Sequence, residues 1–267
     1  MTLPPTDDHS RNGVVEPTTV AAWVPTAGIG NHADRIGACL LAALAAGRDD
    51  LAEDLLLAAD CVAEAGQFDG DALRQAGLGV PPPAGAAGIT VRVLPFALLT
   101  PLDRPRLRRA AYRAGGIGGV DEGAAIAGVA ACVLAADLLR GFDIETCLPR
   151  CHQTLLEEAP AALLAHLRLL EPDAPLSGDD DPTVAVQVAA TALSRGRGVD
   201  AVLASFPADT EVGAGRVLAA TLAAIRDGLE GFDSARLQAH PLHDRALSAA
   251  QALSEAAVSA DRSGGAG

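Results

Sequence analysis

Apolar residues recur along most of the chain every three or four positions, and short stretches rich in Gly, Pro, Asp and Ser separate these runs. This spacing places the apolar side chains on one face of an α-helix. Alternating patterns and clusters of β-branched or aromatic residues, which favour strands, are scarce. The pattern therefore predicts an all-α protein.

Glycine and proline set the expected limits of the helices, because Gly commonly ends a helix and Pro interrupts one. The predicted helices cover residues 31–44, 49–66, 69–76, 89–99, 101–113, 123–139, 144–158, 160–170, 183–193, 199–205, 209–225 and 243–258. Residues 1–29 are rich in Pro, Thr and Gly and are expected to be irregular. We expect a single domain over residues 30–258 and a disordered Ser/Gly tail over residues 259–267.

The most pronounced helix start lies in residues 206–225, where an acidic turn leads into an alanine-rich run. Asp209 is expected to cap this helix and Thr210 to begin it, because side-chain oxygens accept hydrogen bonds from the free N–H groups of a first turn. Asp209 and Glu211 place two carboxylates at this start. Oxygen ligands suit a hard cation such as Mg²⁺, whereas a cap favoured by the helix dipole is the alternative interpretation.

Composition narrows the possible functions. The formal net charge of -14 argues against a nucleic-acid partner, because phosphate binding requires a basic surface. All 20 basic residues are arginine. No apolar run is long enough to span a bilayer, so we expect a cytoplasmic protein without membrane contact. The odd number of cysteines, 5, favours reduced thiols over a disulfide framework.

Cys147, Cys151 and His152 form the one cluster with residue types that bind soft metals. A zinc site needs about four ligands, and no second Cys or His pair has a fitting spacing. The two cysteines share one face of the expected helix, so we predict that they are buried there. His32 near the first helix start is interpreted as a polar surface residue rather than a ligand.

Two stretches resemble signatures of the ADP-ribosylglycohydrolase family. Residues 207–212 (Pro-Ala-Asp-Thr-Glu-Val) resemble its Gly-Gly-Asp-Thr-Asp-Thr turn, with Asp and Thr kept, Glu for the second Asp and Val for the last Thr. Residues 88–95 resemble Gly-x-x-Met-Arg-Val-x-Pro and keep Gly88, Arg92, Val93 and Pro95. The family's Thr-His-Pro-His-Pro segment is replaced at residues 118–122 by Gly-Gly-Val-Asp-Glu, where the two acidic residues suit a helix first turn.

A third comparison concerns the family's Thr-Asp-Asp-Thr metal signature. Aligning the apolar run of the first helix puts Asn-His-Ala-Asp, residues 31–34, in its place, so that only Asp34 keeps a carboxylate there. Residues 6–9 (Thr-Asp-Asp-His) match more literally, but no helix follows them. The family's opening helix, which carries a Gly-Asp-Ala-x-Gly turn, has no counterpart in residues 1–29.

The resemblance implies a compact, orthogonal multi-helix ADP-ribosylglycohydrolase-like domain that is shortened at its N-terminus. The family hydrolyses the N-glycosidic bond of ADP-ribosylated side chains with two Mg²⁺ ions that position the ribose hydroxyls. The metal ligands that it implies are Asp209, Glu211 and Asp34, with Thr210 in support, and the substrate-binding residues are Gly88, Arg92, Gly118 and Gly119. From the residue pattern alone, Arg92 is expected to be semi-buried and to pair with a carboxylate, and this structural ion pair is favoured over a substrate contact.

Because several signature positions differ, the resemblance implies a catalytically impaired homologue with at most weakly bound Mg²⁺. Such a homologue is expected to retain binding of ADP-ribose, a nucleotide or a protein in the ancestral cleft. The alternatives are an active Mg²⁺-dependent N-glycoside hydrolase with a rebuilt site and a helical protein-interaction module with a closed cleft. No catalytic residue is assigned. We expect Asp34 and Asp209 at neighbouring helix starts, since they would share a metal site.

Overall fold

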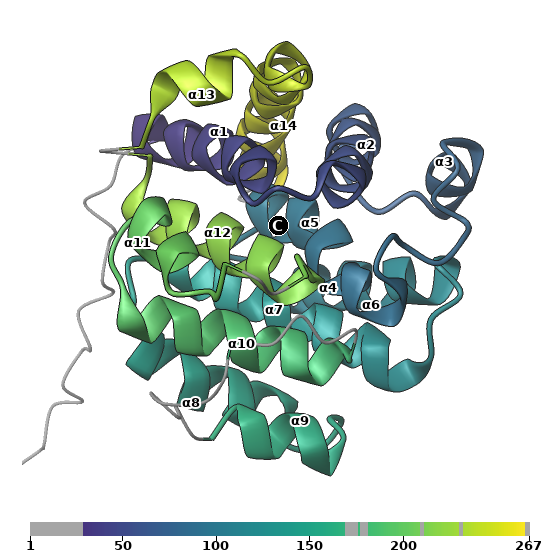
Figure 1. Ribbon diagram of the computed structural model, residues 1–267. Helices are drawn as coiled ribbons and strands as arrows, with labels where there is room; N and C mark the ends of the chain where they lie inside the picture. The colour runs from purple at the N-terminus through teal and green to yellow at the C-terminus, as the bar shows by residue number, and fades with distance from the viewer. Residues whose placement is uncertain (1–28, 169–175, 177–180, 209–210, 230–231, 265–267) are drawn as a thin grey trace, which may run out of the picture.

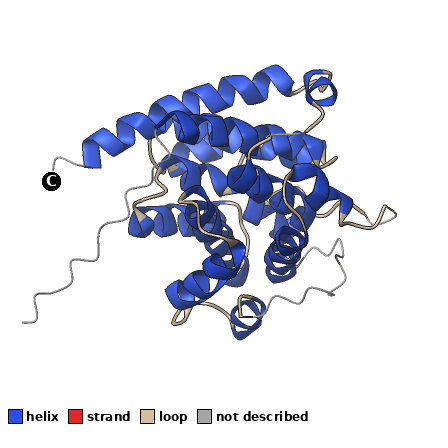
Figure 2. Cartoon of the chain, turned by 90° about the vertical axis from the view of Figure 1, so that its left-hand side faces the viewer, coloured by secondary structure: helices blue, strands red, loops and turns tan. Residues whose placement is uncertain are grey.

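The computed structural model describes residues 29–168, 176, 181–208, 211–229 and 232–264. Every regular element in these residues is a helix and none is a strand (Figure 2), which confirms the all-α prediction. Asp209, Thr210, the N-terminal residues 1–28 and the last three residues of the tail lie outside the described residues.

The helices of the described residues are α1 (Ile29–Ala45), α2 (Asp49–Ala65), α3 (Gly70–Gln75), the short 3-10 helix η1 (Gly85–Gly88), α4 (Ile89–Arg92), α5 (Leu94–Leu99), α6 (Arg104–Ile117), α7 (Glu122–Leu139), α8 (Ile144–Leu155), α9 (Ala161–His166), α10 (Pro182–Arg195), α11 (Val199–Ala204), α12 (Ala214–Asp227), α13 (Ser234–Gln238) and α14 (His243–Gly264).

The core is built around α7, which packs against α4, α5, α6, α8, α10 and α12. By length and composition alone this helix could cross a membrane, so the expectation that no apolar run is long enough is wrong for α7. However, 83% of the helix is buried inside the protein, as expected for a core helix. Gly128 permits this packing, since a Cβ there would lie 3.3 Å from Val93 Cγ2 on the neighbouring segment.

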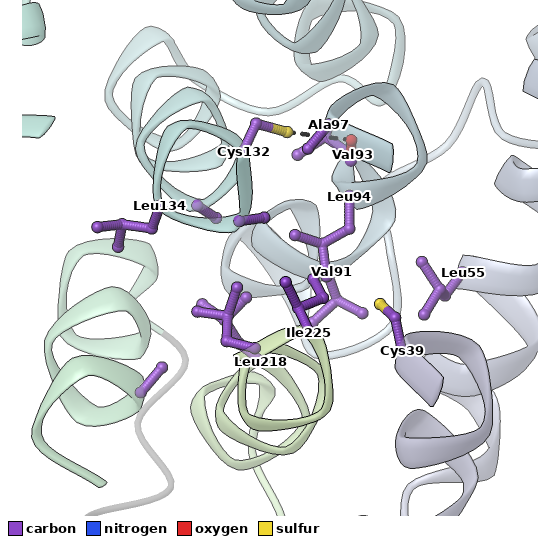
Figure 3. Packing of buried hydrophobic residues seen from close by; sticks show 14 of the residues in the cluster. Cys39, Leu55, Val91, Val93, Leu94, Ala97, Cys132, Leu134, Leu218 and Ile225 are labelled. Carbon is purple, nitrogen blue, oxygen red and sulfur yellow. Dashed lines mark hydrogen bonds between the residues drawn. The ribbon is translucent and has the colours of Figure 1, made fainter. Parts of the chain in front are cut away.

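Buried side chains from several helices meet in the core beside α7 (Figure 3). Leu218 and Ile225 of α12 lie beside Val91 of α4, and all three are fully buried. Cys132 of α7 donates an Sγ–H hydrogen bond to the Val93 carbonyl at 3.1 Å. Its burial raises the pKa of the thiol well above 9.0. This cysteine therefore acts as a small core residue rather than as a nucleophile.

Helix α12 lies between α1 and α10 (Figure 1), and the three helices have defined relative directions. Arg35, near the start of α1, donates hydrogen bonds to the carbonyls of Ile225 and Arg226 at the end of α12. Helices α1 and α12 are therefore antiparallel. Arg226 in turn donates to the Leu193 carbonyl at the end of α10, so α10 and α12 end on the same side.

Helix α12 begins at Ala214, five residues after the expected cap, so the prediction that Asp209 caps this helix and Thr210 begins it is wrong. Residues 211–213 are not helical, and Gly213, the residue before the helix, has an extended backbone with ψ of 175°. The Val212 carbonyl accepts a hydrogen bond from the Arg48 side chain. This tertiary contact keeps the segment extended, where the local sequence alone favours a helix start.

Two other helices extend further than their sequences suggested. Helix α6 continues through Gly115 and Gly116 to Ile117, because Gly115 packs directly against α7: a Cβ there would lie 2.8 Å from Ala125 Cβ. Helix α14 continues to Gly264, so the prediction of a disordered tail from residue 259 is wrong for residues 259–264. Ala260 packs against the core and so favours this longer helix.

Candidate functional site

The structure does not bring Asp34 and Glu211 together. Asp34 lies in the first turns of α1, beside the C-terminal end of α12, whereas Glu211 precedes the N-terminal end of α12. The 14 residues of α12 span about 21 Å at 1.5 Å per residue. The two carboxylates therefore cannot bind one metal ion together. The expectation that Asp34 and Asp209 lie at neighbouring helix starts stays a prediction, because Asp209 lies outside the described residues.

The segment that does meet Glu211 and Val212 is the short connection between α1 and α2. Arg48 Nη1 donates a 2.8 Å hydrogen bond to the Val212 carbonyl, across 164 positions in the sequence. We call the region formed by residues 48–50 and residues 211–213 the α2/α12 junction. It joins the start of α2 to the segment that enters α12.

Arg48 and Asp50 form a two-pronged ion pair within the α2/α12 junction. Arg48 Nε lies 2.8 Å from Asp50 Oδ1, and Nη2 lies 3.2 Å from Oδ2. Asp50 Oδ1 also accepts the Leu51 backbone N–H at 2.9 Å, which satisfies one free donor of the first turn of α2. The Arg48 side chain is 25% exposed. Both oxygens of Asp50 are thus bonded to protein donors.

The remaining acidic groups of the junction do not converge on one point. Asp49 is 65% exposed and lies 3.3 Å from His240 Nε2, which follows α13. Glu211 is exposed to solvent. Across the described ranges, no three His, Cys, Asp or Glu side chains are grouped so that they would hold a metal ion. Two Mg²⁺ ions close together would need several converging carboxylates, and the described residues do not fit such a centre.

Asp49 and Asp50 are the residues that the sequence comparison missed. Two adjacent aspartates open α2 beside the segment that leads into α12. Residues 48–51 read Arg-Asp-Asp-Leu. The sequence signal for these two residues is an Asp-Asp pair at a helix start. The alignment of residues 31–34 with the Thr-Asp-Asp-Thr signature depended instead on the apolar run of α1.

Arg92 forms a buried structural ion pair with Asp54, and the Arg92 side chain is only 4% exposed. Its Nε and Nη2 bind both oxygens of Asp54 at 2.7 and 2.6 Å, and Nη1 donates to the carbonyls of Leu78 and Val80. Because Asp54 is four residues after Asp50, this pair lies one turn along α2 from the α2/α12 junction. The guanidinium therefore forms the structural ion pair that the residue pattern favoured for Arg92.

Gly88 and Gly118 allow close packing of the segments beside them. A Cβ on Gly118 would lie 3.0 Å from Arg92 Nη1, and one on Gly88 would lie 2.0 Å from the Pro83 carbonyl oxygen. Gly119 has a left-handed φ of 70° in the turn after α6. Gly88 and Gly118 thus have packing roles, and their contact with a ligand stays a prediction.

The other chemically suggestive residues have structural partners. His32 Nε2 donates to the Leu98 carbonyl at 2.9 Å, and burial lowers the pKa of this histidine below 6.5. Asp121 caps α7 by accepting the Ala124 N–H at 2.7 Å, which confirms its first-turn role. Cys147 and Cys151 are fully buried on α8, as predicted. His152 accepts a hydrogen bond from Arg168 Nε at 3.0 Å.

No protein-family model matches the sequence, and no curated protein matches it. Among solved structures, the chain resembles one named as an ADP-ribosylglycohydrolase-related protein complex, with a TM-score of 0.71 and 19% sequence identity. The match covers 85% of this chain and 98% of that chain. The protein therefore has an all-helical ADP-ribosylglycohydrolase-like fold. At this identity the likeness concerns the fold, and activity depends on the residues of the site.

Proposed function

We propose that this protein is a catalytically impaired homologue of the ADP-ribosylglycohydrolases that binds ADP-ribose or a related nucleotide without cleaving it. The observation that carries the proposal is the Arg48 guanidinium in the α2/α12 junction, bonded to both oxygens of Asp50 and to the Val212 carbonyl. We infer that this junction corresponds to the region where the family's carboxylates hold two Mg²⁺ ions on the ribose. Among the described residues, the junction holds the Arg48 guanidinium and no group of three converging metal-binding side chains.

Retained binding is supported by the start of α12. Within the described residues no side chain caps this helix, and its first turn contains the small residues Ala214 and Gly215. The unpaired N–H groups of a helix start attract anionic groups such as a pyrophosphate. Arg48 adds a cation next to them, so binding of this kind would not need Mg²⁺.

An assay on peptides that carry ADP-ribosyl-arginine or ADP-ribosyl-serine tests the loss of activity. We expect no hydrolysis above background with millimolar Mg²⁺, because groups that act together on one ribose are not independently dispensable. The matched controls are Asp50→Ala and Asp209→Ala. Turnover by the wild-type protein that disappears in either control would show that the site is active and would overturn the proposal.

Calorimetric titration with ADP-ribose, with and without Mg²⁺, tests the binding. We expect the same heat of binding in both conditions, because Arg48 supplies the positive charge that the ligand meets. Adenine alone is the matched control, since it lacks the pyrophosphate. Absence of binding at millimolar ADP-ribose would refute the proposed binding function.

A helical protein-interaction module is the second candidate, because a groove of about 610 Å³ lies away from the α2/α12 junction. It runs between α1, α14 and the end of α12, and Leu41, Leu229 and Leu247 line it. Leu247 is 46% exposed. Loss of ADP-ribose binding together with a partner whose binding is blocked by Leu247→Asp would favour this candidate.

A further inference from the structure

Arg48 has an unusual position for a surface arginine. Its three bonding nitrogens contact two segments that are far apart in the sequence: Asp50 at the start of α2 and Val212 before α12. An exposed ion pair between near neighbours contributes little to stability by itself. The contact with the Val212 carbonyl is different, because it ties the start of α2 to the extended segment at residues 211–213.

Arg48 is surrounded by acidic groups and a carbonyl oxygen. Asp49, Asp50 and Glu211 lie in the α2/α12 junction, and the Val212 carbonyl adds a neutral oxygen. Carboxylate and carbonyl oxygens are ligands that Mg²⁺ also uses. In this chain a planar guanidinium takes two carboxylate oxygens and one carbonyl oxygen in a fork that suits its geometry.

The guanidinium and a divalent cation would compete for the same oxygens. A cation at Asp50 would have to break the two hydrogen bonds from Arg48 and would also be repelled by the arginine charge at close range. Arg48 itself is permanently charged at physiological pH. The ion pair therefore opposes metal binding at Asp50.

We propose that Arg48 has replaced a divalent cation at the α2/α12 junction. Its side chain neutralises Asp50 and holds residues 211–213 against the start of α2, so that the junction is stable without metal and does not bind Mg²⁺. The inference rests on the proposed function only in placing the ancestral metal region at this junction.

Thermal unfolding of Arg48→Ala, in EDTA and in 5–10 mM MgCl₂ or MnCl₂, tests the inference, at cation concentrations of the order used for weak oxygen-ligand sites. In EDTA we expect the variant to unfold about 3–8 °C below the wild type, because a charge-assisted tertiary contact is lost. Addition of the divalent cation should recover about half of this loss in the variant and leave the wild type unchanged. Calorimetry should show an affinity for Mg²⁺ at least ~10-fold higher in the variant.

Three controls keep the result specific. Arg74→Ala removes an exposed ion pair with Asp71 and should show no cation response. Arg48→Lys keeps the charge but loses the fork, so it should be partly destabilised and still not respond to Mg²⁺. The double variant Arg48→Ala/Asp50→Ala should lose the gained cation response. If Arg48→Ala does not fold in EDTA, the same unfolding experiments are made with Arg48→Gln, which also removes the charge.

The inference is overturned if the wild type is stabilised by Mg²⁺ as strongly as Arg48→Ala, or if Arg48→Ala is as stable as the wild type in EDTA. It is also overturned if Arg74→Ala gains the same cation response, since that would reflect general screening. These outcomes differ from failure of the proposed function. Wild-type turnover in EDTA, or absence of ADP-ribose binding, would refute that function and leave the behaviour of Arg48→Ala unchanged.

Discussion

The two ends of α12 are held in different ways. At the C-terminal end, Arg35 and Arg226 donate hydrogen bonds to backbone carbonyls of α12, of α10 and of the turn after α10. Asp227 accepts the Gly198 N–H at 2.7 Å. At the N-terminal end, Arg48 donates a hydrogen bond to the Val212 carbonyl of the segment before the helix, and the Arg216 guanidinium lies 5.7 Å from the centre of the Phe206 ring. The C-terminal end is thus held by a hydrogen-bond network, and the N-terminal end by fewer bonds among the described residues.

Protonation behaviour shows the same contrast. Burial acts to raise the pKa of Asp227, but the hydrogen bonds from Arg226 and from the Gly198 N–H outweigh it and lower the pKa below 3.8. The carboxylate is thus stabilised in its ionised form by the structure around it. The fixed end anchors α12 in the fold, whereas the start of α12, the loosely held end, has fewer such bonds among the described residues.

Arg226→Ala is expected to give the largest loss of stability. The side chain is only 6% exposed. Its removal leaves the carbonyls of Leu193 and Gly196 and the Asp227 carboxylate without this partner. We expect the free energy of unfolding to fall by about 3–5 kcal/mol, measured by urea denaturation.

Arg197→Ala is the matched control for Arg226→Ala, because Arg197 also pairs with Asp227 but is 72% exposed. Its loss should cost less than about 1 kcal/mol. Equal losses in the two variants would contradict the view that the C-terminal end of α12 depends on a buried network.

The sequence predicted the helices better than their directions. The limits of helix α2 (Asp49–Ala65) were predicted almost to the residue. Its apolar period is regular, and Gly66 ends it with a left-handed φ of 61°. The fold class followed from such periods. However, a helical period does not say whether two packed helices run parallel or antiparallel. The antiparallel packing of α1 and α12 is what separates Asp34 from Glu211, and it is fixed by tertiary contacts such as those of Arg35.

The candidate site was harder to predict for the same reason. Asp209 and Thr210 have good capping chemistry, yet α12 starts at Ala214 because the preceding segment is bonded to Arg48. The role of Arg92 was predictable, since an arginine in an apolar segment needs a carboxylate, and Asp54 supplies it. The role of Arg48 depends on a contact across the fold that leaves no local pattern.

Gly215→Ala examines the packing of the loosely held end and is expected to have an intermediate effect. A Cβ there would lie 3.0 Å from Val188 Cγ1 and 3.2 Å from the Ala185 carbonyl, so α10 and α12 would have to move apart. We expect a loss of about 1–3 kcal/mol in urea denaturation. Gly116→Ala is the control, because this helical glycine has no atom within 4 Å of the added Cβ. It should be neutral or stabilising by up to about 1 kcal/mol; a similar loss in both variants would argue against helix contact as the cause.

The smallest expected effect is the pH dependence that His32 contributes at the fixed end. Burial lowers the pKa of His32 below 6.5, against the opposing effects of the Leu98 carbonyl and Asp261, and Arg35 lowers it further. The unfolded chain then binds a proton near pH 6.5 more readily than the folded chain does. The contribution of neutral His32 is therefore fully present above pH 6.5 and is lost as the pH falls through the lower pKa of the folded state.

His32→Gln isolates this contribution from the other histidines. The glutamine amide can still donate a hydrogen bond to the Leu98 carbonyl, but it does not titrate. We expect the stability of the wild type to fall more steeply than that of the variant between about pH 7 and pH 5, measured by urea denaturation at each pH. Parallel curves for the two proteins would show that the His32 contact contributes no pH dependence, which would contradict this prediction.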